Sequence, residues 1–111
     1  MSFREHAILI HEENTAKRTQ IQSPQDLHIC PHELKVRTGD TVRWLYNELR
    51  QFKCIFERDS PFGKDHMTID GVNGSSPALA VTADVGTFTY NVDERHMEKD
   101  PIIIVEPSIP K

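Results

Sequence analysis

The chain has 111 residues, with 13 basic and 17 acidic side chains and a formal net charge of -4. This length suits one domain, residues 1–111, and folding would hide about 65% of the surface that the unfolded chain exposes. No basic stripe of the kind that follows a phosphate backbone is present, which argues against a nucleic-acid partner. No window is long and apolar enough to span a membrane. Because the sequence shows no export signal, we expect a cytoplasmic protein in which Cys30 and Cys54 are reduced thiols.

Short apolar or alternating segments bounded by turn residues recur along the chain, a pattern typical of an all-β sandwich. The first predicted strand covers residues 6–13. The next, LHICPHELKV, contains Pro31, which lacks a backbone N–H and therefore predicts an edge strand or a bulge. A turn at Gly39 and Asp40 then leads into TVRWLYN, and FKCIFER follows it. Both alternate with a period of two, which places one set of side chains in the core: Val42, Trp44, Tyr46, Phe52, Cys54 and Phe56.

Residues 59–77 are rich in Pro, Gly, Asp, Asn and Ser, and are predicted to form a long surface connection with room for one helical turn. Its apolar side chains are expected to cover one end or edge of the sandwich, the alternative being a contact surface for another protein: Phe62, Met67, Ile69 and Val72. SPALAVTA, TFTYNV and PIIIVEP complete seven or eight predicted strands. TFTYNV is predicted to direct Phe88, Tyr90 and Val92 inward.

Three stretches in this order, ELKVRTGDTVRWLYN, FKCIF and GTFTYNV, resemble the cupredoxin family. The first is similar to that family's strand, Gly-Asp turn and following strand with Val and Trp. The last is similar to the aromatic approach to the family's copper loop. The resemblance covers about residues 27–105 and implies a cupredoxin-like Greek-key β-sandwich, although a fold does not by itself carry an activity.

The resemblance also implies where copper ligands would lie, since the family holds copper with two His, one Cys thiolate and a weak axial Met. The position of the upstream His falls on Phe52 and that of the Cys on Val92, and neither side chain can donate an electron pair. Arg95 has the closest spacing to the second His, with His96 and Met97 after it. We therefore predict that an ordinary blue-copper centre is absent and that Phe52 and Val92 extend the core into its place.

The dipeptides His66-Met67 and His96-Met97 offer a different copper site. An imidazole and a thioether suit Cu(I), so these four residues predict, as the alternative function, a copper carrier or sensor with a rearranged His/Met site. Electron transfer is a weaker form of this alternative.

The run HICPH places His28, Cys30 and His32 on one face of an extended strand. Two of them could share a zinc or copper ion, with further ligands brought by folding from His11, His66 or Cys54. Solvated imidazoles on an edge strand are the favoured interpretation.

Motifs of catalysis are not found in the sequence, which has no Gly-rich phosphate loop, GxSxG or HExxH. Cys54 on an apolar face would be a poor nucleophile, because burial favours the neutral thiol. We therefore expect a protein that is not an enzyme. The leading hypothesis is a non-catalytic, metal-free cupredoxin-like domain that serves as a protein-binding or accessory module. It would use residues 59–77 and the GTFTYNVDERHM end, and unpaired edge strands would also permit self-association.

Overall fold

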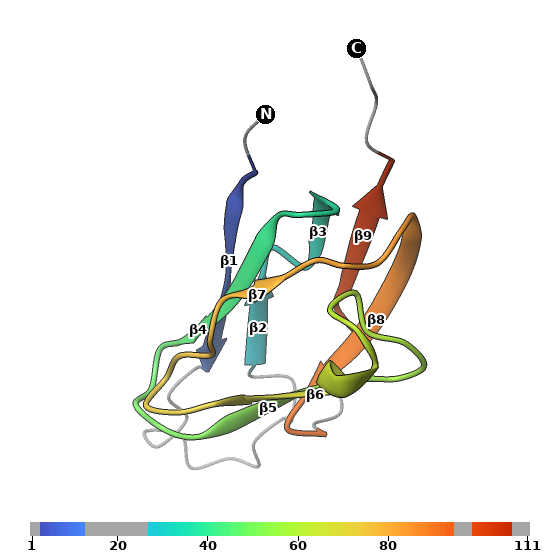
Figure 1. The fold of residues 1–111 in the computed structure, drawn as a ribbon. Helices are drawn as coiled ribbons and strands as arrows, with labels where there is room; N and C mark the ends of the chain where they lie inside the picture. The colour runs from blue at the N-terminus through green and yellow to red at the C-terminus, as the bar shows by residue number, and fades with distance from the viewer. Residues whose placement is uncertain (1–2, 13–26, 95–98, 108–111) are drawn as a thin grey trace.

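The computed structural model describes residues 3–12, 27–94 and 99–107. This part of the chain is built from β-strands and one short 3-10 helix, η1 (Lys64–His66) (Figure 1). The strands in chain order are β1 (Glu5–Glu12), β2 (Leu27–Cys30), β3 (Glu33–Arg37), β4 (Thr41–Tyr46), β5 (Phe52–Phe56), β6 (Thr68–Gly71), β7 (Leu79–Ala80), β8 (Gly86–Val92) and β9 (Ile102–Glu106). A search of the same residues finds no helix with the length and hydropathy needed to traverse a membrane.

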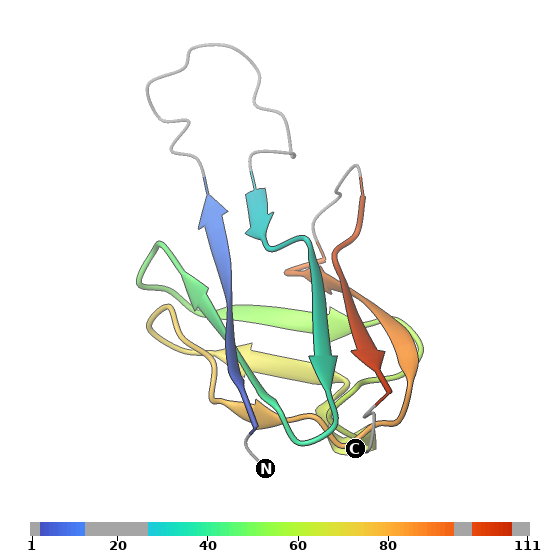
Figure 2. The ribbon, with the colours of Figure 1, turned by 90° about the horizontal axis from the view of Figure 1, so that it is seen from above.

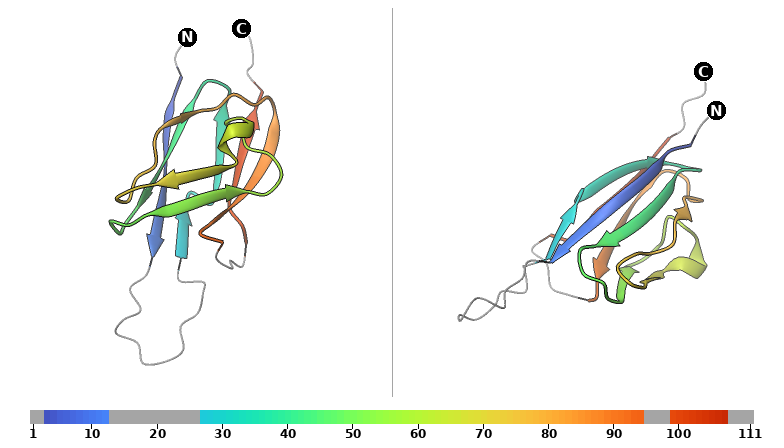
Figure 3. Two further views of the ribbon diagram at one scale, coloured as in Figure 1. Left: turned by 60° about the horizontal axis from the view of Figure 1, so that its bottom comes forward. Right: turned by 90° about the vertical axis from the view of Figure 1, so that its left-hand side faces the viewer.

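The strands form two mixed sheets, which confirms the predicted all-β sandwich. One sheet has four strands in the order β2-β1-β4-β7, and the other has five in the order β3-β9-β8-β5-β6. The pairs β1 with β4 and β3 with β9 are parallel, and the remaining pairs are antiparallel. Figures 2 and 3 show β5 and β6 running across the direction of β1 and also of β3, which lies at the other edge of their own twisted sheet. The two sheets enclose one core.

The segment LHICPHELKV forms two strands instead of the single strand predicted. β2 and β3 lie at the edges of different sheets, and Pro31 lies between them, preceded by a cis peptide bond. Proline cannot donate to a ladder, so the chain leaves the first sheet there and joins the second. The predicted edge position is confirmed for both halves. With β6, this split raises the number of strands in the described part of the chain to nine, compared with seven or eight expected.

The core contains the side chains that the period-two pattern predicted. All six inner-face residues of β4 and β5 are buried, as are Tyr90 and Val92 of β8, whereas Phe88 is partly buried. Trp44 lies at the centre, with edge-to-face ring contacts to Phe56, Phe62 and Tyr90 at centroid distances of 6.3, 5.9 and 5.4 Å. Edge-to-face pairs of this kind add specific geometry to simple apolar burial.

The connection at residues 59–77 is more ordered than its composition predicted. It contains η1 and β6, and β6 pairs with β5 as an edge strand. Phe62 and Ile69 are buried and Met67 packs against the core, so the expectation that the connection covers the sandwich is confirmed for these three. Val72 is 54% exposed and takes no part in this cover.

β8 changes its neighbour partway along its length. Its first residues pair with β9 in the register Gly86 to Thr89, and its last residues pair with β5 in the register Tyr90 to Val92. The strand therefore joins the two halves of the five-stranded sheet, and its two ends lie in different surroundings.

Candidate functional site

Phe52 and Val92, the positions where the sequence resemblance places two copper ligands, lie on the inner face of the five-stranded sheet. Val92 ends β8 directly opposite Cys54, and Phe52 stands two residues from Cys54 on the same side of β5. Diagonal neighbours of this kind are about 7 to 8 Å apart between their Cα atoms. Phe52 is 2% exposed and Val92 is fully buried, so both belong to the apolar core.

The ring of Phe52 lies over Gly71, its partner on β6. A Cβ atom built on Gly71 would collide with Cε1 and Cζ of Phe52, so the ring occupies the space that any other residue at position 71 would need. The ring also contacts that of Tyr46, with centroids 5.3 Å apart. The position is thus shaped to hold a phenyl ring, and Gly71 is the residue that makes the space.

Beyond Val92 the chain turns through Asp93 and Glu94, both with a φ of 56°, a left-handed conformation that Asp tolerates better than most residues. The Asp93 carboxylate accepts hydrogen bonds from Lys53 N at 2.8 Å and from Arg50 Nη2 at 3.3 Å. The Arg50 guanidinium also lies 5.4 Å from the centre of the Tyr46 ring. Ion pairing and cation–π contact therefore close this end of the sandwich.

Cys54 lies directly opposite Val92 on the neighbouring strand, but its environment favours the neutral thiol. Burial, followed by the negative charge of Asp93, raises the pKa of this thiol far above its ordinary value. A thiolate is the form that binds a metal, so the burial of Cys54 opposes metal binding by this thiol. Cys30 is exposed, and both cysteines are unpaired.

His66 and Met67 point into different environments. His66 is exposed in η1, whereas Met67 packs against the core and its carbonyl accepts a hydrogen bond from Phe56 N at 2.8 Å. The other two residues of the proposed His/Met copper site, His96 and Met97, lie outside the described residues, as does Arg95. The site therefore stays a prediction.

The HICPH residues are separated by the change of sheet at Pro31. His28 and Cys30 are exposed on β2, while His32 lies beyond the bend, where its Nε2 donates to Lys99 O at 3.0 Å. The residue opposite His28 is His11 on β1, with ring centroids 6.3 Å apart. Over residues 3–12, 27–94 and 99–107, no three His, Cys, Asp or Glu side chains are grouped closely enough to hold a metal ion.

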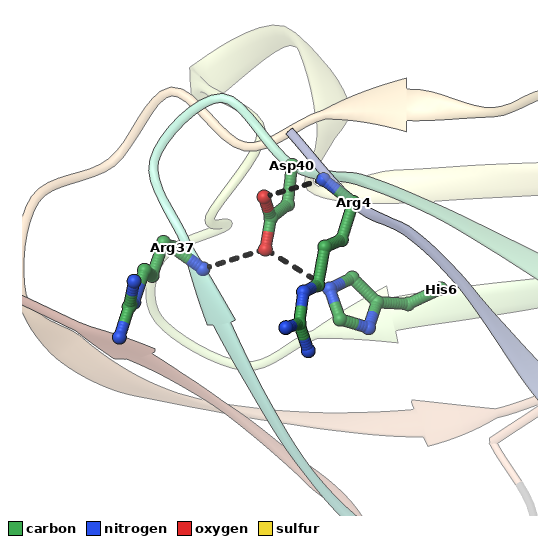
Figure 4. Close-up of polar contacts among 4 residues, drawn as sticks. All are labelled: Arg4, His6, Arg37 and Asp40. Carbon is green, nitrogen blue, oxygen red and sulfur yellow. Dashed lines mark hydrogen bonds and ion pairs between the residues drawn. The ribbon is translucent and has the colours of Figure 1, made fainter. Parts of the chain in front are cut away.

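A polar centre that the sequence did not reveal surrounds Asp40, at the turn between β3 and β4 (Figure 4). Its carboxylate accepts hydrogen bonds from Arg4 N at 3.0 Å, Arg37 N at 3.1 Å and His6 Nε2 at 2.9 Å. Burial alone raises the pKa of Asp40, but these three donors more than offset it and hold the pKa below its ordinary value of 3.8. The carboxylate ties the start of β1 to the turn, and the adjacent pocket of about 190 Å³ is smaller than most ligand sites.

A larger cleft of about 530 Å³ opens where β8 leaves β5. It is lined by residues 57–59 and 85–89, and we call it the β8 cleft. Its volume falls in the range of ligand-binding clefts. The cleft joins the start of the long connection to the start of GTFTYNVDERHM, the two segments that the sequence suggested for partner binding.

Comparison with known proteins gives matches to solved structures alone: no protein-family model and no curated protein matches the chain. A purple cupredoxin from Nitrosopumilus maritimus is similar with a TM-score of 0.59 and 14% identity, over 90% of this chain and 98% of that one. A pseudoazurin from Sinorhizobium has a TM-score of 0.55 and 16% identity, over 96% and 77%. An oxidised amicyanin variant has a TM-score of 0.52 and 23% identity, over 90% and 82%. Similarity at these identities concerns the fold, and the chain therefore has a cupredoxin-like fold, as the resemblance in its sequence predicted.

Proposed function

We propose that this chain is a metal-free, non-catalytic cupredoxin-like module that binds another protein in the cytoplasm. The observation that carries the metal-free part is the seating of the Phe52 ring over Gly71 and against Tyr46. A position that had only lost its ligand would be left with a gap, whereas this one is closely packed.

The residues around Val92 support the same proposal. Copper in this fold needs a thiolate beside two imidazoles, because soft sulfur and nitrogen ligands set both its affinity and its geometry. The position opposite Val92 offers the neutral thiol of Cys54, and the residue after it offers a carboxylate already held by Arg50 and Lys53. This donor set does not fit a blue-copper ion.

The protein-binding part rests on the β8 cleft, a surface of suitable size with an unpaired strand edge. The unpaired Cys30 and Cys54 are compatible with the reducing conditions of the cytoplasm.

Copper titration of protein purified without a histidine tag tests the metal-free proposal. We expect no stoichiometric Cu(I) or Cu(II) and no visible absorption band from thiolate-to-copper charge transfer. A variant carrying His11→Asn and His28→Asn removes the exposed histidine pair on β1 and β2, so that weak surface binding is counted separately. Stoichiometric copper that survives in this variant would contradict the proposal. Its loss on His66→Asn or His96→Asn would then establish the His/Met carrier, and its loss on Cys54→Ser would establish a thiolate site.

A further inference from the structure

The first half of β8 presents a hydrogen-bonding edge that no described strand covers. Tyr90 N donates to Pro101 O on the β9 side, and Thr89 O accepts from Glu57 N on the β5 side. Backbone groups of successive strand residues point alternately to the two neighbours. The N–H and C=O of Thr87 therefore point to the β5 side, where the ladder has ended because β5 pairs with β8 only at residues 54–56.

This edge opens into the β8 cleft, which has room for a short extended segment. In an antiparallel ladder one residue exchanges both of its hydrogen bonds with a single partner residue, whereas a parallel ladder divides them between two. Thr87, whose N–H and C=O point away from β9, is thus enough to anchor an antiparallel segment. Such a segment would lie beside β8 in line with β5, beyond Glu57.

The lining of the cleft specifies the side chains of that segment. Thr87 and the acidic Glu57 are exposed on the outer face of the sheet. Asp59 is a second exposed acidic side chain of the lining, and Arg58 is its one basic side chain. On the inner side lies Phe88, which is partly buried against the core. Because strand side chains alternate between faces, a complementary segment would carry basic residues outward and β-branched apolar residues inward.

We propose that the β8 cleft binds an extended segment of a partner protein, with alternating basic and β-branched apolar residues, as an added antiparallel strand beside Thr87. This proposal rests on the protein-binding function proposed above and names its site and the chemistry of its partner. The main-chain bonds to Thr87 provide the anchor, and the acidic pair Glu57 and Asp59 selects for basic residues.

A synthetic peptide with the sequence acetyl-Thr-Val-Lys-Val-Lys-Val-Thr-amide provides the probe, followed by amide chemical shifts of the full chain. We expect shifts at residues 57–59 and 85–89 and a dissociation constant on the order of 1 mM or tighter. N-methylation of both lysine residues should abolish binding, because the lysine N–H groups face β8. N-methylation of the valines should leave it unchanged, because their N–H groups point away. Replacing the lysines with glutamate should weaken binding at least tenfold.

Thr87→Pro removes the Thr87 N–H, which points away from β9, and should abolish binding while the β8–β9 hydrogen bonds remain. Thr87→Val keeps that N–H and serves as the matched control. A silent titration at millimolar peptide, equal binding of the two N-methylated peptides, or shifts centred on another face would overturn the proposal. Concentration-dependent shifts at the same amides without peptide would identify a second copy of this chain as the occupant and would also overturn it. A negative result here leaves the copper titration unaffected, so failure of the cleft and failure of the metal-free function are told apart.

Discussion

Replacing Asp40 with asparagine tests whether the polar centre at the β3–β4 turn stabilises the fold through its charge. The carboxylate has two acceptor oxygens: Oδ1 serves Arg4 N, and Oδ2 serves both Arg37 N and His6 Nε2. Asparagine keeps the shape but has a single acceptor oxygen. Whichever way the amide is turned, its NH₂ group faces one of the two backbone N–H donors and leaves that donor unsatisfied.

The expected cost of Asp40→Asn at neutral pH is about 1 kcal/mol, the lower end of the penalty for a donor without an acceptor, because both backbone hydrogen bonds are only partly buried. The hydrogen bonds hold the pKa of Asp40 below 3.8 in the folded state, so the charge stabilises the fold above that pH. This contribution is lost as the pH falls through the folded-state pKa. A protonated carboxyl also has a donor where an acceptor is needed, so the wild type and the variant should then converge.

Urea unfolding of both proteins, from neutral pH to below 3.8, measures the difference directly, with Asp84→Asn as a control at an exposed aspartate. The free-energy difference should be largest at neutral pH and should shrink once the pH falls below 3.8. A difference that is absent at neutral pH, or that is the same at every pH, would refute the reasoning.

Two further predictions concern the packing of Phe52 against Gly71 and the reactivity of the two cysteines. Gly71→Ala should destabilise the protein by about 1 to 3 kcal/mol through overpacking against the Phe52 ring. In a Phe52→Ala background the same substitution should cost almost nothing. A double-mutant cycle measured by urea unfolding checks this, and additive effects would show that the two residues are not coupled. Iodoacetamide at neutral pH should alkylate the exposed Cys30 of the native protein while sparing Cys54, whose pKa burial raises, and mass spectrometry should find both modified only after unfolding. Equal labelling of the two native cysteines would contradict the buried, neutral thiol.

The sequence predicted the strands whose two faces differ. Val42, Trp44 and Tyr46 alternate with polar residues because one side of β4 faces the core and the other faces water, so a period of two is visible in the sequence. Phe52 and Val92 were placed correctly in the core for the same reason. The alternation of apolar and polar side chains indicates which residues are buried, and these predictions concerned burial alone.

What the sequence did not reveal depends on contacts between distant residues. The segment containing β6 resembles a loop because Gly71 and Asp70 are typical of turns, and the value of a missing side chain at position 71 is apparent only with the Phe52 ring in place. Asp40 likewise resembles an ordinary turn residue, because two of its three donors come from the start of β1, 34 and 36 positions away. Local patterns carry no signal for such partners.

The packing around Phe52 shows that a phenyl ring at this position depends on its neighbours. A phenyl ring is larger than an imidazole, and the Phe52 ring fills the space that a side chain at position 71 would need. Gly71 leaves that space free, and the Tyr46 ring packs against the Phe52 ring. At the far end of β5, the strand separates from β8 and leaves the Thr87 edge open. In the function proposed above, the same strand packs Phe52 where a metal would lie and, by ending early, leaves room for a partner segment beside Thr87.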